Sequence, residues 1–279
     1  MTIEIMTIFK ESFKDVREHK MEWVRVATAP VILWLVGILI LALAYVSTGL
    51  PWISNIIENS MQGTQNFIEK PFSLTLADTI YHIFTFISTI CLLINGYRYG
   101  FLKEGGDRFW TLKLNWRFVK MCLYYFLVLI LTALYVAIAA GISIGIYFLV
   151  ESVALSTILG VLFTLYGFYL IVRIGLTFFL IAIDRTIPIR ISWRLLKGNV
   201  LRFLGLMLLI FLTIFLIIIA GCIVLGLFGW LLSLVSPTLL VIPFILLFIF
   251  GIILWFISWA VTAKAFALVY KTFTEGEIF

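Results

Sequence analysis

FLGLMLLIFLTIFLIIIAGCIVLGLFGWLLSL, residues 203–234, contains no Asp, Glu, Lys or Arg. A helix needs about 20 apolar residues to cross the hydrocarbon core of a bilayer, so this segment can span it with residues to spare. Over the whole chain of 279 residues, 63% are hydrophobic and 12% are charged. Since about a quarter of the residues of a soluble domain are charged, we interpret the chain as an integral membrane protein.

Further apolar runs of similar length flank this segment on both sides. We expect six spans, at about 28–49, 80–101, 119–150, 155–183, 203–234 and 238–263. None of them shows the alternating pattern of an outer-membrane barrel strand, so the spans are expected to be helical. The predicted fold class is all-α: a polytopic membrane helical bundle forming a single membrane domain over residues 1–279.

The charged residues between the spans predict the topology. Lys and Arg gather before span 1, in the 2–3 and 4–5 connections and after span 6, whereas Lys70 is the one basic residue on the opposite side. Because cytoplasmic segments carry the excess of Lys and Arg, both termini are predicted to be cytoplasmic. The net charge of +6 is therefore interpreted as a topology signal rather than as a nucleic-acid-binding surface.

A basic, aromatic lead-in precedes every second span and predicts a threefold repeat. The lead-ins are FKDVREHKMEWVRV at 13–26, RFWTLKLNWRFVKM at 108–121 and RISWRLLKGNVLRFLGL at 190–206. The units cover about 5–102, 107–186 and 190–275. Each unit enters and leaves on the cytoplasmic side, so the prediction is three parallel two-helix repeats with cytoplasmic amphipathic lead-in helices.

Two of these lead-ins have a definite helical pattern. Residues 3–22 are expected to form an interfacial helix, because Ile5, Ile8, Phe9, Phe13 and Val16 make one apolar stripe. In the third lead-in, Arg190, Arg194 and Lys197 share a helix face. They are candidates for contact with anionic lipid headgroups, each worth about 1 kcal/mol; the alternative is that they only set topology.

Two short stretches carry a resemblance to a known group of proteins. SWRLLKGNVLRFLGL at 192–206, following the Asp-Arg-Thr-Ile-Pro connection at 184–188, and GYRYGFLKEGG at 96–106 are those stretches. They resemble uncharacterised six-span bacterial inner-membrane proteins, similar to the membrane domain of some glycerophosphoryl diester phosphodiesterases. The resemblance implies a helical bundle in the bacterial cytoplasmic membrane, and it implies no catalytic activity.

A cation within the fourth span, YLIVRIGLTFFLIAID at 169–184, is the main candidate for a binding site. Arg173 shares a helix face with Tyr166, Tyr169 and Thr177, and an intramembrane arginine is expected to point into the bundle. We therefore expect it in an interior shared by spans 2, 4 and 6, where Asn95 of span 2 also points. Two roles are open: the hub of a buried polar network, or a site for an anionic ligand such as a lipid headgroup.

Conventional catalytic and metal-binding motifs do not occur in the sequence, so no enzyme activity, cofactor or metal is predicted. The leading hypothesis is a lipid-interacting scaffold or accessory subunit of the membrane. Its partners would be membrane phospholipids and either another protein or a second copy of the chain. The alternative is a small transporter or channel with a path lined by spans 2, 4 and 6. A GxxxG at Gly141 and Gly145 in span 3 suggests close helix contact there.

Overall fold

The computed structural model describes residues 3–61, 69–109, 112, 114–234, 236, 239 and 241–274. Within these residues the chain forms helices and no strand. The elements are α1 (Ile5–Glu18), α2 (Lys20–Ala44), the π-helical η1 (Tyr45–Gly49), α3 (Leu50–Met61), α4 (Phe72–Leu102), α5 (Trp116–Val150), α6 (Val153–Arg173), α7 (Thr177–Ala182), α8 (Pro188–Leu195), α9 (Val200–Ser233) and α10 (Val241–Thr274). Six helical stretches are long and apolar enough to cross a membrane, which confirms the predicted six-span fold and identifies a multi-pass membrane protein.

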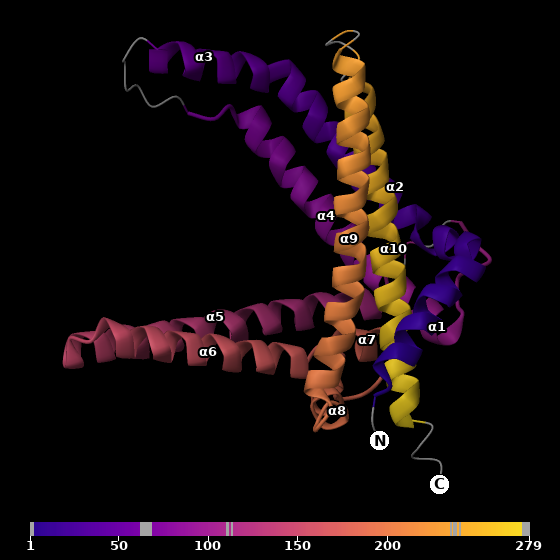
Figure 1. The fold of residues 1–279 in the computed structure, drawn as a ribbon, viewed down its shortest axis with the longest axis vertical. Helices are drawn as coiled ribbons and strands as arrows, with labels where there is room; N and C mark the ends of the chain where they lie inside the picture. The colour runs from indigo at the N-terminus through magenta and orange to yellow at the C-terminus, as the bar shows by residue number, and fades with distance from the viewer. Residues whose placement is uncertain are drawn as a thin grey trace.

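The spans form three helical pairs that diverge from a common base (Figure 1). α2 packs along α4, α5 along α6, and α9 along α10. The short helices α1, α7 and α8 gather at the base, where the C-terminal end of α10 also lies (Figure 1). The α5–α6 pair extends to one side, away from the outer ends of α9 and α10. These pairs belong to the three predicted units; the sequence repeat itself stays a prediction.

The buried core lies at this base. Its largest fully buried side chains come from different helices: Trp23 of α2, Tyr99 of α4, Met121 of α5, Phe179 of α7 and Leu206 of α9. Beyond the base, α5 and α6 expose apolar side chains along their lengths, and Met121 and Gly167 are their buried residues. Since exposed apolar surface of this extent needs a nonaqueous environment, the outer parts of the pairs fit contact with lipid hydrocarbon.

The fourth span is two helices rather than one. α6 ends at Arg173, and the turn Ile174–Leu176 separates it from α7. α6 is largely exposed, whereas five of the six residues of α7 are buried. The span predicted at about 155–183 is found as Val153–Ala182, but its helix is interrupted, so a helix face cannot be extended across the turn from Arg173 to Thr177.

The first lead-in forms α1, but its apolar stripe contacts protein. α1 packs against α9 and α10. Ile8 and Val16 are buried there, while Ile5, Phe9 and Phe13 pack against the core partly buried. The predicted interfacial helix over 3–22 is thus corrected: a helix of this pattern can bury its stripe in lipid or against other helices, and this one uses other helices.

The other two lead-ins differ from each other. The third forms α8, as predicted. In the second, the described residues between α4 and α5 form turns, and Asn115 caps α5 by accepting a hydrogen bond from the Arg117 amide at 3.1 Å. Trp110, Thr111 and Lys113 of this lead-in, and the end of the third unit at 275, lie outside the described residues.

Candidate functional site

Arg173 lies at the C-terminal end of α6, where it contacts α8. Its guanidinium carbon is 3.8 Å from the centre of the Trp193 ring, and its Nε donates a hydrogen bond of 3.4 Å to the Trp193 carbonyl. Nη1 donates to the Tyr169 hydroxyl at 3.0 Å, and the Tyr169 ring stacks on that of Tyr166. The structure therefore brings Arg173, Tyr169 and Tyr166 together, as predicted, and adds Trp193.

The other two predicted members of this site lie elsewhere. Thr177 is fully buried in α7. Asn95 of α4 donates to the Val26 carbonyl of α2 at 3.2 Å. Pro30 has no N–H to give to that carbonyl four residues earlier, so Asn95 supplies the missing donor. The predicted polar interior of spans 2, 4 and 6 around Arg173 is therefore not formed by these residues.

Spans 2, 4 and 6 do meet, but through α7 and with aromatic side chains. The Tyr97 ring of α4 lies 5.5 Å from Phe179 of α7 and 5.6 Å from Phe266 of α10. Phe179 also contacts Tyr270 of α10, with ring centres 5.5 Å apart. All four side chains are buried. The interior shared by spans 2, 4 and 6, which was expected to surround Arg173, is at this place an aromatic core.

A buried arginine, Arg98 at the end of α4, is the centre of the main polar cluster at the base. Its side chain makes five hydrogen bonds, which matches the five N–H donors of a guanidinium. Nε and Nη2 donate to the Glu104 carboxylate at 2.6–2.9 Å, and Nη1 donates to the Ala182 carbonyl at 2.8 Å and to Asp184 at 3.2 Å. Arg117 of α5 holds Asp184 from the other side at 2.7–2.8 Å. The cluster ties α4, α5 and α7 together.

Charge in this cluster is balanced, since two guanidinium groups face two carboxylates. The hydrogen bond from Arg117 is the main cause that lowers the pKa of Asp184 below its usual value; burial opposes it, and Arg98 adds to the lowering. Asp184 also has a positive φ of 62°, a conformation that Asp tolerates better than most residues. The carboxylate is therefore held ionised as a structural partner.

The lowered pKa predicts a loss of stability in acid. A depressed folded-state pKa stabilises the fold fully above the unfolded value of about 3.9, and this contribution is lost as pH falls below it. We expect the thermal unfolding midpoint in detergent to fall between pH 6 and pH 3.5 by more in the wild type than in Asp184→Asn. Asp107→Asn, an exposed control, should behave as wild type. Equal acid sensitivity of all three proteins would contradict the role given to Asp184.

A second cluster joins the first and last helices to α4. The Asp15 carboxylate of α1 lies 3.0 Å from both Lys103 and Lys264, and Trp23 Nε1 donates to it at 3.2 Å. Burial acts to raise the pKa of Asp15, but the hydrogen bonds from Lys264 and Lys103 outweigh it and lower the pKa. Nearby, the Tyr99 hydroxyl donates to Glu22 at 2.5 Å. Both clusters are paired within the protein and present no free base or nucleophile.

α8 has one buried and one basic face. Pro188, Ser192 and the following Leu196 are buried, and the Ser192 hydroxyl donates to the Arg173 carbonyl at 3.0 Å. Arg190, Arg194 and Lys197 are exposed, together with Trp193. None of these three cations forms an ion pair with a residue that the structure describes. Arg190 and Arg194 lie on α8, whereas Lys197 lies in the turn after it; the shared face of all three stays a prediction.

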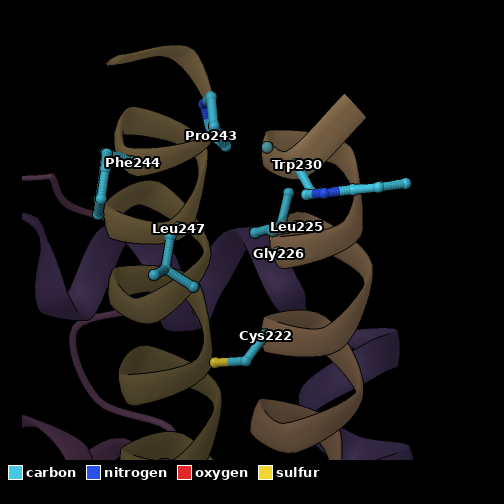
Figure 2. Close-up of a pocket in the computed structure, with 8 residues that line it drawn as sticks. Cys222, Leu225, Gly226, Trp230, Pro243, Phe244 and Leu247 are labelled. Carbon is cyan, nitrogen blue, oxygen red and sulfur yellow. The ribbon is translucent and has the colours of Figure 1, made fainter. Parts of the chain in front are cut away.

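The described surface has apolar hollows in two regions. A groove along the α5–α6 pair has two connected parts, of about 320 and 470 Å³. A smaller pocket of about 210 Å³ lies between α9 and α10, where the Cys222 sulfur points toward α10 (Figure 2). Its other lining residues are Leu225, Gly226, Gly229, Trp230, Pro243, Phe244 and Leu247. This pocket offers no charged group to orient a polar ligand, whereas the α5–α6 groove ends at Trp193 beside Arg173.

Comparison of the chain with protein-family models, curated proteins and solved structures gives no match. Among the described residues, no group of three or more His, Cys, Asp or Glu side chains is placed to hold a metal ion. The residues that sequence reasoning missed are Arg98, Glu104 and Trp193. The charge pattern predicts only a topology role for Arg98, although Arg98 lies in 96–106, one of the two stretches that carry the resemblance.

Proposed function

We propose that this chain is a non-enzymatic, lipid-interacting scaffold or accessory subunit of the bacterial cytoplasmic membrane, with both termini in the cytoplasm. The observation that carries the proposal is the exposed basic face of α8. Two cations and a tryptophan of α8, with Lys197 in the turn after it, are exposed next to helices long and apolar enough to cross a membrane, and none of the three cations pairs with a described residue. Tryptophan favours the membrane–water interface, and lysine and arginine are attracted to anionic headgroups.

Two further observations support this function. The charged clusters around Arg98 and Asp15 are paired within the protein, so their role is to hold the base together. The outer parts of the helical pairs expose apolar side chains over a large area. Such a surface suits lipid and also suits the partners expected of a subunit, either another membrane protein or a second copy of this chain.

The proposal predicts a preference for anionic lipid that depends on α8. The protein would be reconstituted with spin-labelled phosphatidylglycerol or phosphatidylcholine, and the fraction of each motionally restricted lipid measured. Replacing Arg190, Arg194 and Lys197 with Gln should reduce the preference for phosphatidylglycerol about fivefold or more, since each cation contributes about 1 kcal/mol near the surface. The effect should shrink at high salt.

A matched control carries the same change of net charge. Lys10, Lys14 and Arg17 of α1 are also exposed, and their replacement with Gln should reduce the preference much less. The proposal fails if both triple variants keep nearly all of the preference for phosphatidylglycerol, or if the wild type binds both lipids equally. In either case α8 is not a lipid-contact surface.

A further inference from the structure

The groove on the α5–α6 pair runs along one continuous face of both helices. Its inner part is lined by α5, α6, the turn after α6 and Trp193 of α8, and its outer part by α5 and α6. The two parts share the lining residues Thr132, Tyr135, Gly167 and Ile171, so the hollows adjoin, with the Tyr135 ring packed on Gly167 where they meet. Between Gly160 and Ile174 the groove is about 20 Å long at the rise of an α-helix. This length covers the roughly 15 Å depth of one leaflet of the hydrocarbon core.

The lining of the groove is apolar, and small residues make room within it. Gly160, Ala139 and Ala140 contribute no bulky side chain, whereas the space over Gly167 is occupied by the Tyr135 ring. Two polar groups on the groove are already bonded: the Tyr135 hydroxyl donates to the Phe163 carbonyl at 2.6 Å, and the Thr164 hydroxyl to the Gly160 carbonyl at 2.8 Å. A hydrocarbon chain could therefore lie here without separating these groups from their partners.

A cation with N–H donors to spare lies beside Trp193, which lines the inner part of the groove. Arg173 stacks on Trp193, which lines the groove, and forms no ion pair with a described carboxylate. Its Nε and Nη1 have partners, but Nη2 makes no hydrogen bond with any residue that the structure describes. A guanidinium fixed in this way presents unused N–H donors, the geometry that suits a phosphate oxygen.

We propose that this groove binds one phospholipid of the cytoplasmic leaflet, with an acyl chain between α5 and α6 and the headgroup phosphate at Arg173. Charge complementarity supports this assignment, because the apolar groove reaches Trp193, which stacks on a cation that has no ion pair with a described residue and lies near the cations of α8. The inference rests on the proposed function and deepens it, because it assigns a single bound lipid to a defined site instead of general attraction to the surface.

The test uses the full chain in nanodiscs that contain phosphatidylglycerol with a photoreactive group on one acyl chain. After irradiation, the labelled peptides are identified by mass spectrometry. We expect labelling to concentrate on the groove faces of α5 and α6. Ala139→Phe fills the groove and should reduce this labelling about tenfold. Ala137→Phe, the same change at an exposed position of α5 outside the groove lining, should leave it unchanged.

The headgroup contact is tested by Arg173. Arg173→Gln should lower groove labelling by anionic lipid about tenfold, the order expected for lost charge-assisted hydrogen bonds. Arg173→Lys should retain part of it, because it keeps the charge but not the planar fork. A thermal unfolding midpoint equal to that of wild type shows that each variant is folded.

Labelling spread evenly over α5 and α6, or unaffected by Ala139→Phe, would overturn the groove site. Labelling that is confined to the groove but indifferent to Arg173 would overturn the headgroup contact. Either result is compatible with a lipid preference that still depends on α8. Failure of this inference is therefore distinguishable from failure of the proposed function. Conversely, an α8 variant with unchanged lipid preference and intact groove labelling would reject the role of α8 alone.

Discussion

Replacing Arg98 with methionine is expected to lower the free energy of unfolding by about 3 kcal/mol, since breaking a buried ion pair costs several kcal/mol. Arg98 is 5% exposed and makes five hydrogen bonds at the base. Methionine fills a similar length but removes the Arg98 donor from the Ala182 carbonyl and breaks the ion pair with Glu104. The thermal unfolding midpoint in detergent should fall by on the order of 10 °C.

The control for this prediction is an arginine of the same connection with no buried contact. Arg108 pairs with Asp107 at the surface, where both side chains are almost fully exposed. Surface pairs of this kind contribute about 0–1 kcal/mol, so Arg108→Met should leave the midpoint almost unchanged. Equal shifts for Arg98→Met and Arg108→Met would show that the Arg98 cluster does not hold the base together.

Replacing glycine with alanine is expected to have opposite effects on stability at Gly96 and Gly141. Each is the first glycine of a separate GxxxG motif. At Gly96 of α4, an added Cβ would lie 2.4 Å from a ring carbon of Trp259. That ring also contacts Trp23 and Phe256, with ring centres 5.6 Å apart in both cases, so it has little room to move. Gly96→Ala should destabilise the protein by about 1–3 kcal/mol through overpacking of α4 against α10.

At Gly141 of α5 nothing lies within 4 Å of an added Cβ. Gly141→Ala should therefore stabilise the protein by up to about 1 kcal/mol, the difference in helix propensity between the two residues. Both variants would be compared with wild type by thermal unfolding in detergent. A loss of stability at Gly141 as large as that at Gly96 would mean that α5 packs more closely than the structure shows.

These two glycines illustrate what the sequence could and could not predict. Gly141 and Gly145 form a GxxxG and face open space, whereas Gly96 and Gly100 form one that packs against α10, where the Gly100 position meets the Ala263 carbonyl at 3.2 Å. The motif permits close approach of two helices but does not choose the partner. Composition and charge, by contrast, act on whole segments, and they predicted the six spans correctly.

The Arg173 site was predictable only within one helix. Tyr166, Tyr169 and Arg173 share α6, so helical spacing placed them together. Thr177 lies beyond the turn Ile174–Leu176, where the spacing no longer applies. No proline in the turn indicates from the sequence that the helix ends there. The burial of α7 against α4 and α10 depends on tertiary packing, which local sequence does not predict. Trp193 reaches Arg173 from α8, a contact across the chain that no local pattern encodes.

The Asp15 cluster has a consequence for the order in which the chain is made. Asp15 leaves the ribosome before Lys264, which follows about 250 residues later, about 12–50 s at 5–20 residues per second. Lys103 comes 88 residues after Asp15 and so within about 4–18 s. The Asp15 carboxylate can thus be neutralised by Lys103 while the remaining helices are still being synthesised. The arrival of Lys264 then fastens the last helix to the first.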